Sequence, residues 1–225
     1  MKAEKGKKTR ILIVDDHPMT RAGLVHLINH QPEMVVYGEA EDAAQALDLL
    51  ASKRPDLMLI DITLPGKSGL ELVKDVKAMH PDLPMLVLSM HDESLYADRV
   101  LRAGARGYIT KHEGGDKLMG AIRHVLSGRI YVSESMSAHI LEIFSGGRTG
   151  IDRSSIQKLS DREFEVFEAL GEGLSSHEIA KKLHLSAKTV DAHRANIKTK
   201  LKINTTAELI SFSARWAATQ SKQPI

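Results

Sequence analysis

The chain has 225 residues, of which 42% are hydrophobic and 27% are charged, and its formal net charge is +2. This composition is typical of a globular protein, and the length allows one large domain or two small ones. The absence of cysteine excludes a disulfide framework and thiolate chemistry. The N-terminus is basic but lacks the apolar stretch of a secretory signal, and no run approaches a membrane span, so we expect a cytoplasmic protein with no membrane contact.

The first half of the chain alternates short apolar runs with segments of helical periodicity. The runs predict strands at about 10–14, 34–38, 57–60, 85–88 and 107–110, and the segments between and after them predict helices at about 17–30, 42–53, 68–79, 92–103 and 114–127. Such alternation forces right-handed crossovers and a parallel sheet that is covered on both faces. The predicted fold of residues 1–128 is therefore a doubly wound, flavodoxin-like α/β domain with five strands.

Four of these strands run into chemically special residues. Asp15 and Asp16 follow the first strand, Asp61 the third, Ser89 the fourth and Lys111 the fifth. In an open parallel sheet, reactive groups collect in the crevice outside the carboxyl ends of the strands. We therefore expect the three acids, the hydroxyl and the lysine to share one pocket.

The charges of this pocket indicate its chemistry. Each close pair of carboxylates repels by about 4 kcal/mol near a protein surface, so the cluster requires a cation or partial protonation. Mg2+ takes oxygen ligands and pairs with phosphate, whereas the lack of Cys, and of His inside these motifs, disfavours zinc. Beside such an ion, Asp61 is a candidate nucleophile for a phosphoryl group, with Lys111 neutralising its oxygens and Ser89 donating a hydrogen bond. Taken singly, each residue also fits a helix cap or a surface charge.

The second half of the chain has a different pattern. Residues 129–155 are predicted to form a linker that contains one short helix, at 135–144. Residues 156–225 contain only helical patterns, in which Ser160 and Glu163 form a capping box at the start of a helix that ends near Leu170. A second helix begins at Ser176 and a third, capped by Ser186, runs to about Leu201. Two short helices joined by a tight turn are typical of a helix-turn-helix, whose second helix enters a DNA groove.

The third of these helices carries the charge expected of a nucleic-acid contact. Residues 181–202 contain seven basic residues and one acidic residue, which is typical of a surface that binds a polyanion, although a solvated helix face has the same composition. Val190, His193, Ile197 and Leu201 form one apolar stripe on this helix. The predicted DNA-binding residues are Lys188, Thr189, Asp191, Ala192, Ala195, Asn196 and Lys200. Arg194 lies near the stripe, where a salt bridge competes with a DNA contact as its role.

Residues 9–127 resemble the receiver domain of bacterial response regulators. The matching residues are Asp15, Asp16, the segment 61–66 with the sequence Asp-Ile-Thr-Leu-Pro-Gly, Gly69, Ser89, Tyr108 and Lys111. The resemblance implies that Asp61 is the phosphoacceptor, that Asp16 and Asp61 bind Mg2+ directly, and that Asp15 acts through water, with the carbonyl of Thr63 as a further ligand. It also implies that Ser89 and Tyr108 form a switch pair. Many receivers have proline after the lysine, where this chain has His112, which leaves the cis or trans state of that peptide bond open.

Residues 159–210 resemble the LuxR-type helix-turn-helix domain. The residues that carry the match are Leu159, Ser160, Arg162, Glu163, Gly173, Ile179, Ala180, Leu183, Ser186, Lys188, Thr189, Val190, His193, Ile197, Lys200 and Leu201. Together with a receiver, this domain makes the chain similar to two-component response regulators of the NarL/FixJ family. The family implies a fourth helix at about 206–217, with Ala207, Ile210 and Ala214 in a dimer contact, although packing on their own domain is an alternative.

The resemblance implies a phosphorylation-dependent transcription regulator. A sensor histidine kinase would phosphorylate Asp61, and the C-terminal helices would then bind DNA as a homodimer. The protein would not be an enzyme acting on external substrates, although its receiver would support phosphoryl transfer to itself and slow autodephosphorylation. The alternatives are an aspartyl-phosphate phosphotransferase or phosphatase, and a receiver that ignores phosphate and responds to a partner. No insertion is present to build a substrate cap, and the complete set of Asp61, Ser89 and Lys111 favours phosphorylation over the second alternative.

Overall fold

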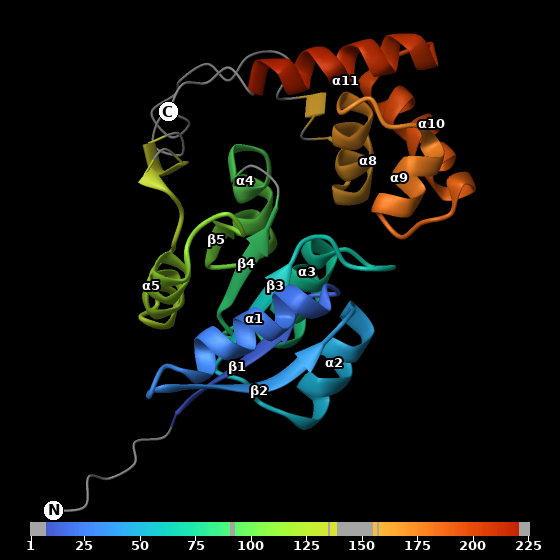
Figure 1. The fold of residues 1–225 in the computed structure, drawn as a ribbon. Helices are drawn as coiled ribbons and strands as arrows, with labels where there is room; N and C mark the ends of the chain where they lie inside the picture. Colours follow the sequence, from blue (N-terminus) through green and yellow to red (C-terminus); the bar gives the residue numbers. More distant parts are fainter. Residues whose placement is uncertain (1–7, 91–92, 135, 139–154, 157, 221–225) are drawn as a thin grey trace, which may run out of the picture. The chain divides into compact units, whose positions relative to one another are not determined.

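The chain folds into two compact units, Met1–Met136 and Ser137–Ile225, in a computed structural model (Figure 1). The structure describes residues 8–90, 93–134, 136–138, 155–156 and 158–220. Among these residues no helix combines the length and the apolar character required to cross a membrane.

The first unit is the predicted α/β domain. Its strands are β1 (Thr9–Val14), β2 (Met34–Ala40), β3 (Leu57–Asp61), β4 (Met85–Ser89) and β5 (Gly107–Thr110). All neighbouring strands pair in parallel, in the order β2-β1-β3-β4-β5. The helices between and after them are α1 (Pro18–Asn29), α2 (Ala43–Ser52), α3 (Gly69–Met79), α4 (Glu93–Ala103) and α5 (Gly115–Leu126). The prediction of a flavodoxin-like, five-stranded parallel sheet is confirmed.

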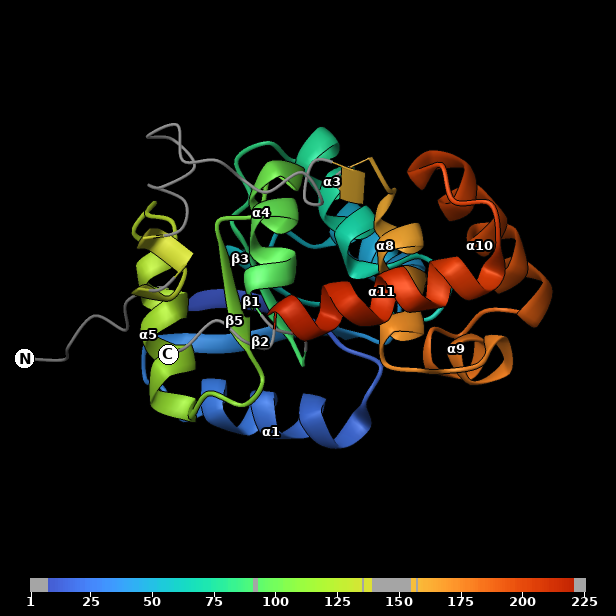
Figure 2. The same ribbon diagram turned by 90° about the horizontal axis from the view of Figure 1, so that it is seen from above.

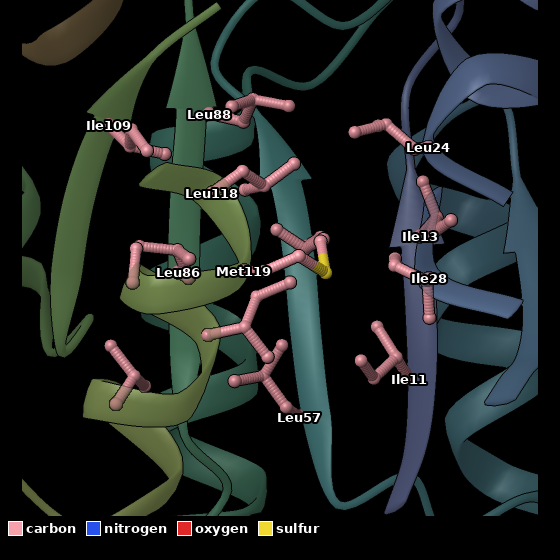
Figure 3. Close-up of a cluster of buried hydrophobic side chains, with 14 of the residues drawn as sticks. Ile11, Ile13, Leu24, Ile28, Leu57, Leu86, Leu88, Ile109, Leu118 and Met119 are labelled. Atoms are coloured by element: carbon pink, nitrogen blue, oxygen red, sulfur yellow. The ribbon is translucent and has the colours of Figure 1, made fainter. Parts of the chain in front are cut away.

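Helices cover both faces of this sheet. In Figures 1 and 2, α1 lies on one side of the sheet and α3 and α4 lie on the other. Figure 3 shows how the first side packs: Ile28 of α1 and Met119 of α5 lie over Ile13 of β1 and Leu57 of β3. All four side chains are at most 4% exposed. Burial of these apolar side chains from water stabilises the sheet.

One pairing at the edge of the sheet is absent from the sequence prediction. After α5 the chain returns to β5, where the backbone N–H of Tyr108 donates to the carbonyl oxygen of Tyr131 at 3.0 Å, and the N–H of Tyr131 donates to that of Arg106 at 2.9 Å. A single bridge of this kind has no periodic signature. Further on, residues 134 and 136–138 are helical, and the rest of the helix predicted at 135–144 lies outside the described residues.

The second unit contains the predicted four helices, which are α8 (Asp161–Gly171), α9 (Ser176–Lys182), α10 (Ala187–Leu201) and α11 (Thr206–Gln220). In both views α11 lies beside α8, and their aromatic rings pack together: the ring centroids of Phe164 and Trp216 are 5.6 Å apart in an edge-to-face arrangement (Figures 1 and 2). Val190 and Ile197 of α10 are fully buried. The hydrophobic core of this unit therefore forms where α10 and α11 pack against α8.

Caps define the starts of these helices. Ser160 and Glu163 form the predicted capping box of α8, and the Oγ of Ser186 accepts from the N–H of Thr189 at the start of α10. The cap of α9 is Ser175, which forms a second capping box with Glu178, so this helix begins as predicted at Ser176. Local hydrogen-bonding chemistry thus places the helix-turn-helix.

Candidate functional site

The ends of β1, β3 and β5 bring three charged side chains into contact. The Nζ of Lys111 lies 2.8 Å from Oδ2 of Asp15 and 2.6 Å from Oδ2 of Asp61. The side chains are 8%, 1% and 4% exposed, respectively. A lysine that lies 96 residues after its first partner is thus enclosed between two buried carboxylates. The sequence predicted this convergence from the ends of parallel strands alone.

Backbone groups hold both carboxylates in place. The N–H of His17 donates to Oδ1 of Asp15 at 2.8 Å, and the N–H of Thr63 donates to Oδ1 of Asp61 at 3.2 Å. The segment after Asp61 then folds back sharply, with the N–H of Gly69 donating to the carbonyl oxygen of Ile62 at 2.7 Å. A Cβ at Gly69 would lie 1.9 Å from the carbonyl oxygen of Asp61, so this turn admits no side chain.

Burial and charge act in opposite directions on the proton affinities of this cluster. Burial raises the pKa of Asp61 to about 6, against the lowering effect of the ammonium of Lys111. Burial alone lowers the pKa of Lys111, but the charge of Asp61 and the hydrogen bonds that the ammonium donates to both carboxylates outweigh this effect, and the pKa of Lys111 is raised. At neutral pH Lys111 is therefore protonated. Asp61 is mostly ionised, and any further positive charge nearby would stabilise its anionic form.

The donor atoms of the cluster fit a divalent cation. One ligand atom from each of Asp15, Asp16, His17 and Asp61 lies within 4.8 Å of the others. Three carboxylates match the oxygen preference of Mg2+. The ring of His17 was missed by the sequence analysis, which treated the strand-end motifs as free of histidine; its position directly after Asp16 was the available signal.

Two further predicted receiver residues, Ser89 and Tyr108, belong to β4 and β5. Ser89 and Tyr108 are fully buried, and the N–H of Lys111 donates to the carbonyl oxygen of Ser89 at 2.7 Å. Thr63 is half-buried beside Asp61. The peptide bond between Lys111 and His112, whose isomer the sequence left open, is trans. The predicted phosphoryl and metal residues other than Tyr108 thus lie at the carboxyl ends of the strands or directly after them, whereas Tyr108 is the second residue of β5 and pairs with Val87 of β4.

The predicted DNA-binding residues lie on α10, and most of them are exposed. Those exposed to solvent are Lys188, Asp191, Ala192, Ala195, Asn196 and Lys200, whereas Thr189 is half-buried. The hydroxyl of Thr189 lies 2.7 Å from that of Ser186 and belongs to the cap of the helix. Val190 and Ile197 are buried and His193 is half-buried, in agreement with the predicted apolar stripe.

Several charged groups of α10 have partners within their own unit. The Nζ of Lys200 lies 2.6 Å from Oε2 of the buried Glu163. The hydroxyl of Ser176 in α9 donates to Oδ1 of Asp191 at 2.8 Å, and Arg194 forms an ion pair with Asp191 at 3.6 Å. The salt bridge considered for Arg194 is therefore present. Lys188 has no ion pair or hydrogen bond among those found for the described residues, and its side chain is available to an external anion.

The three residues predicted for a dimer contact share one face of α11. Ala207, Ile210 and Ala214 are all exposed, and 40% of Ile210 is accessible to solvent. Leu209, Ser213 and Trp216 of α11 are buried, and the ring of Phe212 packs against that of Phe167. The alternative, in which the three residues pack on their own domain, does not agree with this arrangement.

Two protein families match separate parts of the chain. Residues 11–123 match the family described as response regulator receiver domain, and residues 157–213 match bacterial regulatory proteins of the luxR family. The oxygen regulatory protein NreC of Staphylococcus carnosus is 34% identical over 211 residues, which cover 92% of this chain and 97% of NreC. NreC of Staphylococcus aureus strain USA300 is 34% identical over 210 residues, with the same coverage.

Solved structures agree with the sequence matches. A LuxR-family two-component response regulator from Aurantimonas sp. SI85-9A1 is 35% identical, with a TM-score of 0.58 over 62% of this chain and 99% of that one. RcsB from Salmonella enterica serovar Typhimurium, bound to the promoter rprA in the presence of the phosphomimetic BeF3-, is 26% identical, with a TM-score of 0.62 over 92% of this chain and 99% of RcsB. The chain therefore belongs to the bacterial response regulators that join a receiver domain to a luxR-family regulatory domain.

Proposed function

We propose that this protein is a phosphorylation-dependent transcription regulator whose receiver accepts a phosphoryl group on Asp61 from a sensor histidine kinase. The observation that carries the proposal is the contact of the ammonium of Lys111 with both Asp15 and Asp61, 2.8 and 2.6 Å away. This arrangement places a nucleophilic carboxylate beside a buried cation at the open end of a parallel sheet. It is the set of groups that phosphoryl transfer to a carboxylate requires.

The proposed transfer is a substitution at phosphorus. An oxygen of the Asp61 carboxylate attacks the phosphorus of a phosphohistidine, the P–N bond breaks, and its electron pair goes to the imidazole of the kinase. Lys111 holds the equatorial oxygens, and the hydroxyl of Ser89 donates to the transferred group while Tyr108 changes its packing. Asp15, Asp16, Asp61 and the carbonyl of Thr63 are the proposed ligands of Mg2+, which when bound neutralises charge on the phosphoryl oxygens. Slow attack by water on the acyl phosphate then regenerates Asp61.

Labelling by a small phosphodonor tests this assignment. We expect the wild-type protein with Mg2+ and acetyl phosphate to gain one phosphoryl group by intact mass, and Asp61→Asn to gain none. Asp48→Asn, which changes an exposed carboxylate of α2, is the matched control and should be labelled like the wild type. Persistent labelling of Asp61→Asn would place the phosphoacceptor elsewhere.

The proposed output is sequence-specific DNA binding by a homodimer. Lys188, Ala192, Ala195 and Asn196 present an exposed face of α10, and Ile210 lies on the exposed face of α11. The RcsB neighbours support this output, since one is a structure of two RcsB dimers bound to two parallel DNAs. Because the target of such a protein is DNA, we place it in the cytoplasm.

Selection of bound sequences from random DNA, with and without phosphodonor, should yield two inverted half-sites. Uniform binding that falls only with salt would indicate a nonspecific binder.

The proposed link between the two units is a population shift. The unphosphorylated receiver favours a state in which the DNA-binding face is covered, and the phosphoryl group favours a released state that dimerises. A change from 1:99 to 99:1 requires a bias of about 5.5 kcal/mol between the two states. Footprints with and without phosphodonor measure this bias, and identical footprints would show regulation without phosphate.

A further inference from the structure

The acidic pocket contains one group that the proposed Mg2+ chemistry does not use. The Nδ1 of His17 lies 2.7 Å from Oδ1 of Asp16 and 3.5 Å from Oδ1 of Asp15. Its ring is 61% exposed, so it borders the open side of the cluster while the carboxylates of Asp15 and Asp61 lie beneath. An imidazole nitrogen therefore lies among the carboxylate oxygens that are available to a metal ion.

The spacing of these donors suits one octahedral ion. Bonds of about 2.1 Å place neighbouring ligands about 3 Å apart and opposite ligands a little over 4 Å apart. The ligand atoms of Asp15, Asp16, His17 and Asp61 all lie within 4.8 Å of one another, so only a small contraction separates them from a single coordination sphere. His17 therefore reaches the same ion as its acidic neighbours.

We propose that His17 is a direct metal ligand and that it makes this site prefer a divalent transition ion, with Mn2+ as the representative, over Mg2+. The inference rests on the proposed function for the identity of the metal site. Mg2+ binds oxygen ligands and retains its waters, so an imidazole adds little to its affinity. Mn2+ shares the preference for carboxylate oxygen, and transition ions in general gain from imidazole nitrogen. A set of three carboxylates and one imidazole therefore discriminates between the two ions.

The structure permits a clean substitution at this position. His17 is the N-cap of α1, but its side chain makes no capping hydrogen bond. The bond from residue 17 to Asp15 is donated by the backbone N–H and survives a change of side chain. His17→Gln keeps a polar side chain of similar reach and removes only the imidazole. His26→Gln is the matched control, because His26 is an exposed histidine of the same helix.

Pulsed electron paramagnetic resonance of bound Mn2+ tests the inference without any phosphodonor. We expect a coupling to one imidazole nitrogen in the wild type and in His26→Gln, and its loss in His17→Gln and in Asp16→Asn. Calorimetric titration should show the Mn2+ affinity of His17→Gln about tenfold lower, with Mg2+ affinity changed less than about twofold. A wild-type spectrum without nitrogen coupling, or an unchanged ratio of the two affinities, would overturn the inference.

The outcome is separable from that of the proposed function. If His17 only donates a hydrogen bond to Asp16, the nitrogen coupling is absent and the preference for Mn2+ is unchanged, yet labelling of Asp61 with Mg2+ proceeds. If instead Asp61→Asn is still labelled, the proposed function fails whatever the spectrum of Mn2+ shows.

Discussion

The receiver pocket and the exposed face of α10 use charge in opposite ways. In the receiver, Lys111, Asp15 and Asp61 are almost completely buried and satisfy one another. On α10 of the second unit, the ammonium of Lys188 belongs to an exposed side chain. Burial of a charge costs free energy of desolvation, so buried charges need partners held in place by the surrounding strands. Exposed charges have almost no such cost. The receiver pocket thus holds a reactive centre at a cost in stability, whereas the exposed face of α10 leaves Lys188 available to an external polyanion.

Removal of the buried cation should have the largest effect. Lys111→Met leaves two buried carboxylates without their ammonium, so we expect the free energy of unfolding of the receiver to fall by about 3 to 5 kcal/mol in metal-free buffer. Urea unfolding in a chelator at pH 8 measures this loss. Lys117→Met is the matched control, since Lys117 is 69% exposed in its ion pair with Glu113 and should change stability by less than about 0.5 kcal/mol. Equal effects of the two substitutions would show that the pocket charges are not buried in solution.

The pH dependence of stability tests whether the carboxylate of Asp61 is buried in solution. The pKa of Asp61 is raised from 3.8 to about 6 in the folded protein, so the folded state binds this proton more tightly than the unfolded chain does. The contribution of Asp61 to stability is therefore fully present below pH 4 and is lost as the pH rises through 6, by about 3 kcal/mol in total. The difference between the wild type and Asp61→Asn in metal-free urea unfolding should follow this curve. A difference that stays constant from pH 4 to pH 7.5 contradicts it.

A backbone change beside the pocket should have the next largest effect. A Cβ at residue 69 would lie 1.9 Å from the carbonyl oxygen of Asp61, so Gly69→Ala must displace the backbone that carries the phosphoacceptor. We expect a loss of about 1 to 3 kcal/mol, together with slower labelling of Asp61. In Gly120→Ala, nothing lies within 4 Å of the new Cβ, which sits inside α5, so this control should gain about 0.5 to 1 kcal/mol. A neutral Gly69→Ala would contradict the tight turn.

The receiver pocket was predictable from sequence because parallel strands end at a common edge. That rule brought Asp15, Asp61, Ser89 and Lys111 together without any knowledge of their distances. It did not identify His17, because the ring reaches the cluster through the turn after Asp16 and the turn geometry is not encoded in strand periodicity. Nor could periodicity reveal the bridge between Gly107 and Tyr131, which is a single pair at the edge of the sheet.

On α10, sequence patterns identified the faces but not the partners. Helical spacing correctly separated the buried Val190 and Ile197 from the exposed residues. It could not show that Lys200 pairs with Glu163, because the two residues belong to different helices and are 37 positions apart. Pairing of this kind depends on how α8 and α10 pack, which is a tertiary property. The fold is therefore needed to tell which cationic residues of α10 pair within the protein, as Lys200 does, and which are available to DNA, as Lys188 is.

Lys200→Ala tests the role of a cationic residue of α10 that pairs within the protein. Its ammonium lies 2.6 Å from the buried carboxylate of Glu163, whose pKa is lowered because the hydrogen bonds from Lys200 and Ser160 outweigh the effect of burial. We expect a loss of about 1 kcal/mol in the free energy of unfolding at pH 7, since Lys200 is partly exposed and screened by solvent. Thermal unfolding of the full chain measures it. A loss that persists in the background of Glu163→Gln would assign it to another contact.

Lys188→Ala tests a cationic residue of α10 that is available to DNA, and it should have the smallest effect on stability. Lys188 is exposed near the N-terminus of α10, so its removal should change stability by less than about 0.5 kcal/mol. In binding to the selected DNA site, however, it should lower affinity at all salt concentrations and reduce the slope of log affinity against log salt by about one unit if the ammonium contacts a phosphate. A relaxed preference at one base pair with an unchanged slope would instead place Lys188 on a base edge. If neither the slope nor the preference changes, the recognition face of α10 is incorrectly assigned, and the contrast between the buried charges of the receiver and the available charges of α10 loses its functional meaning.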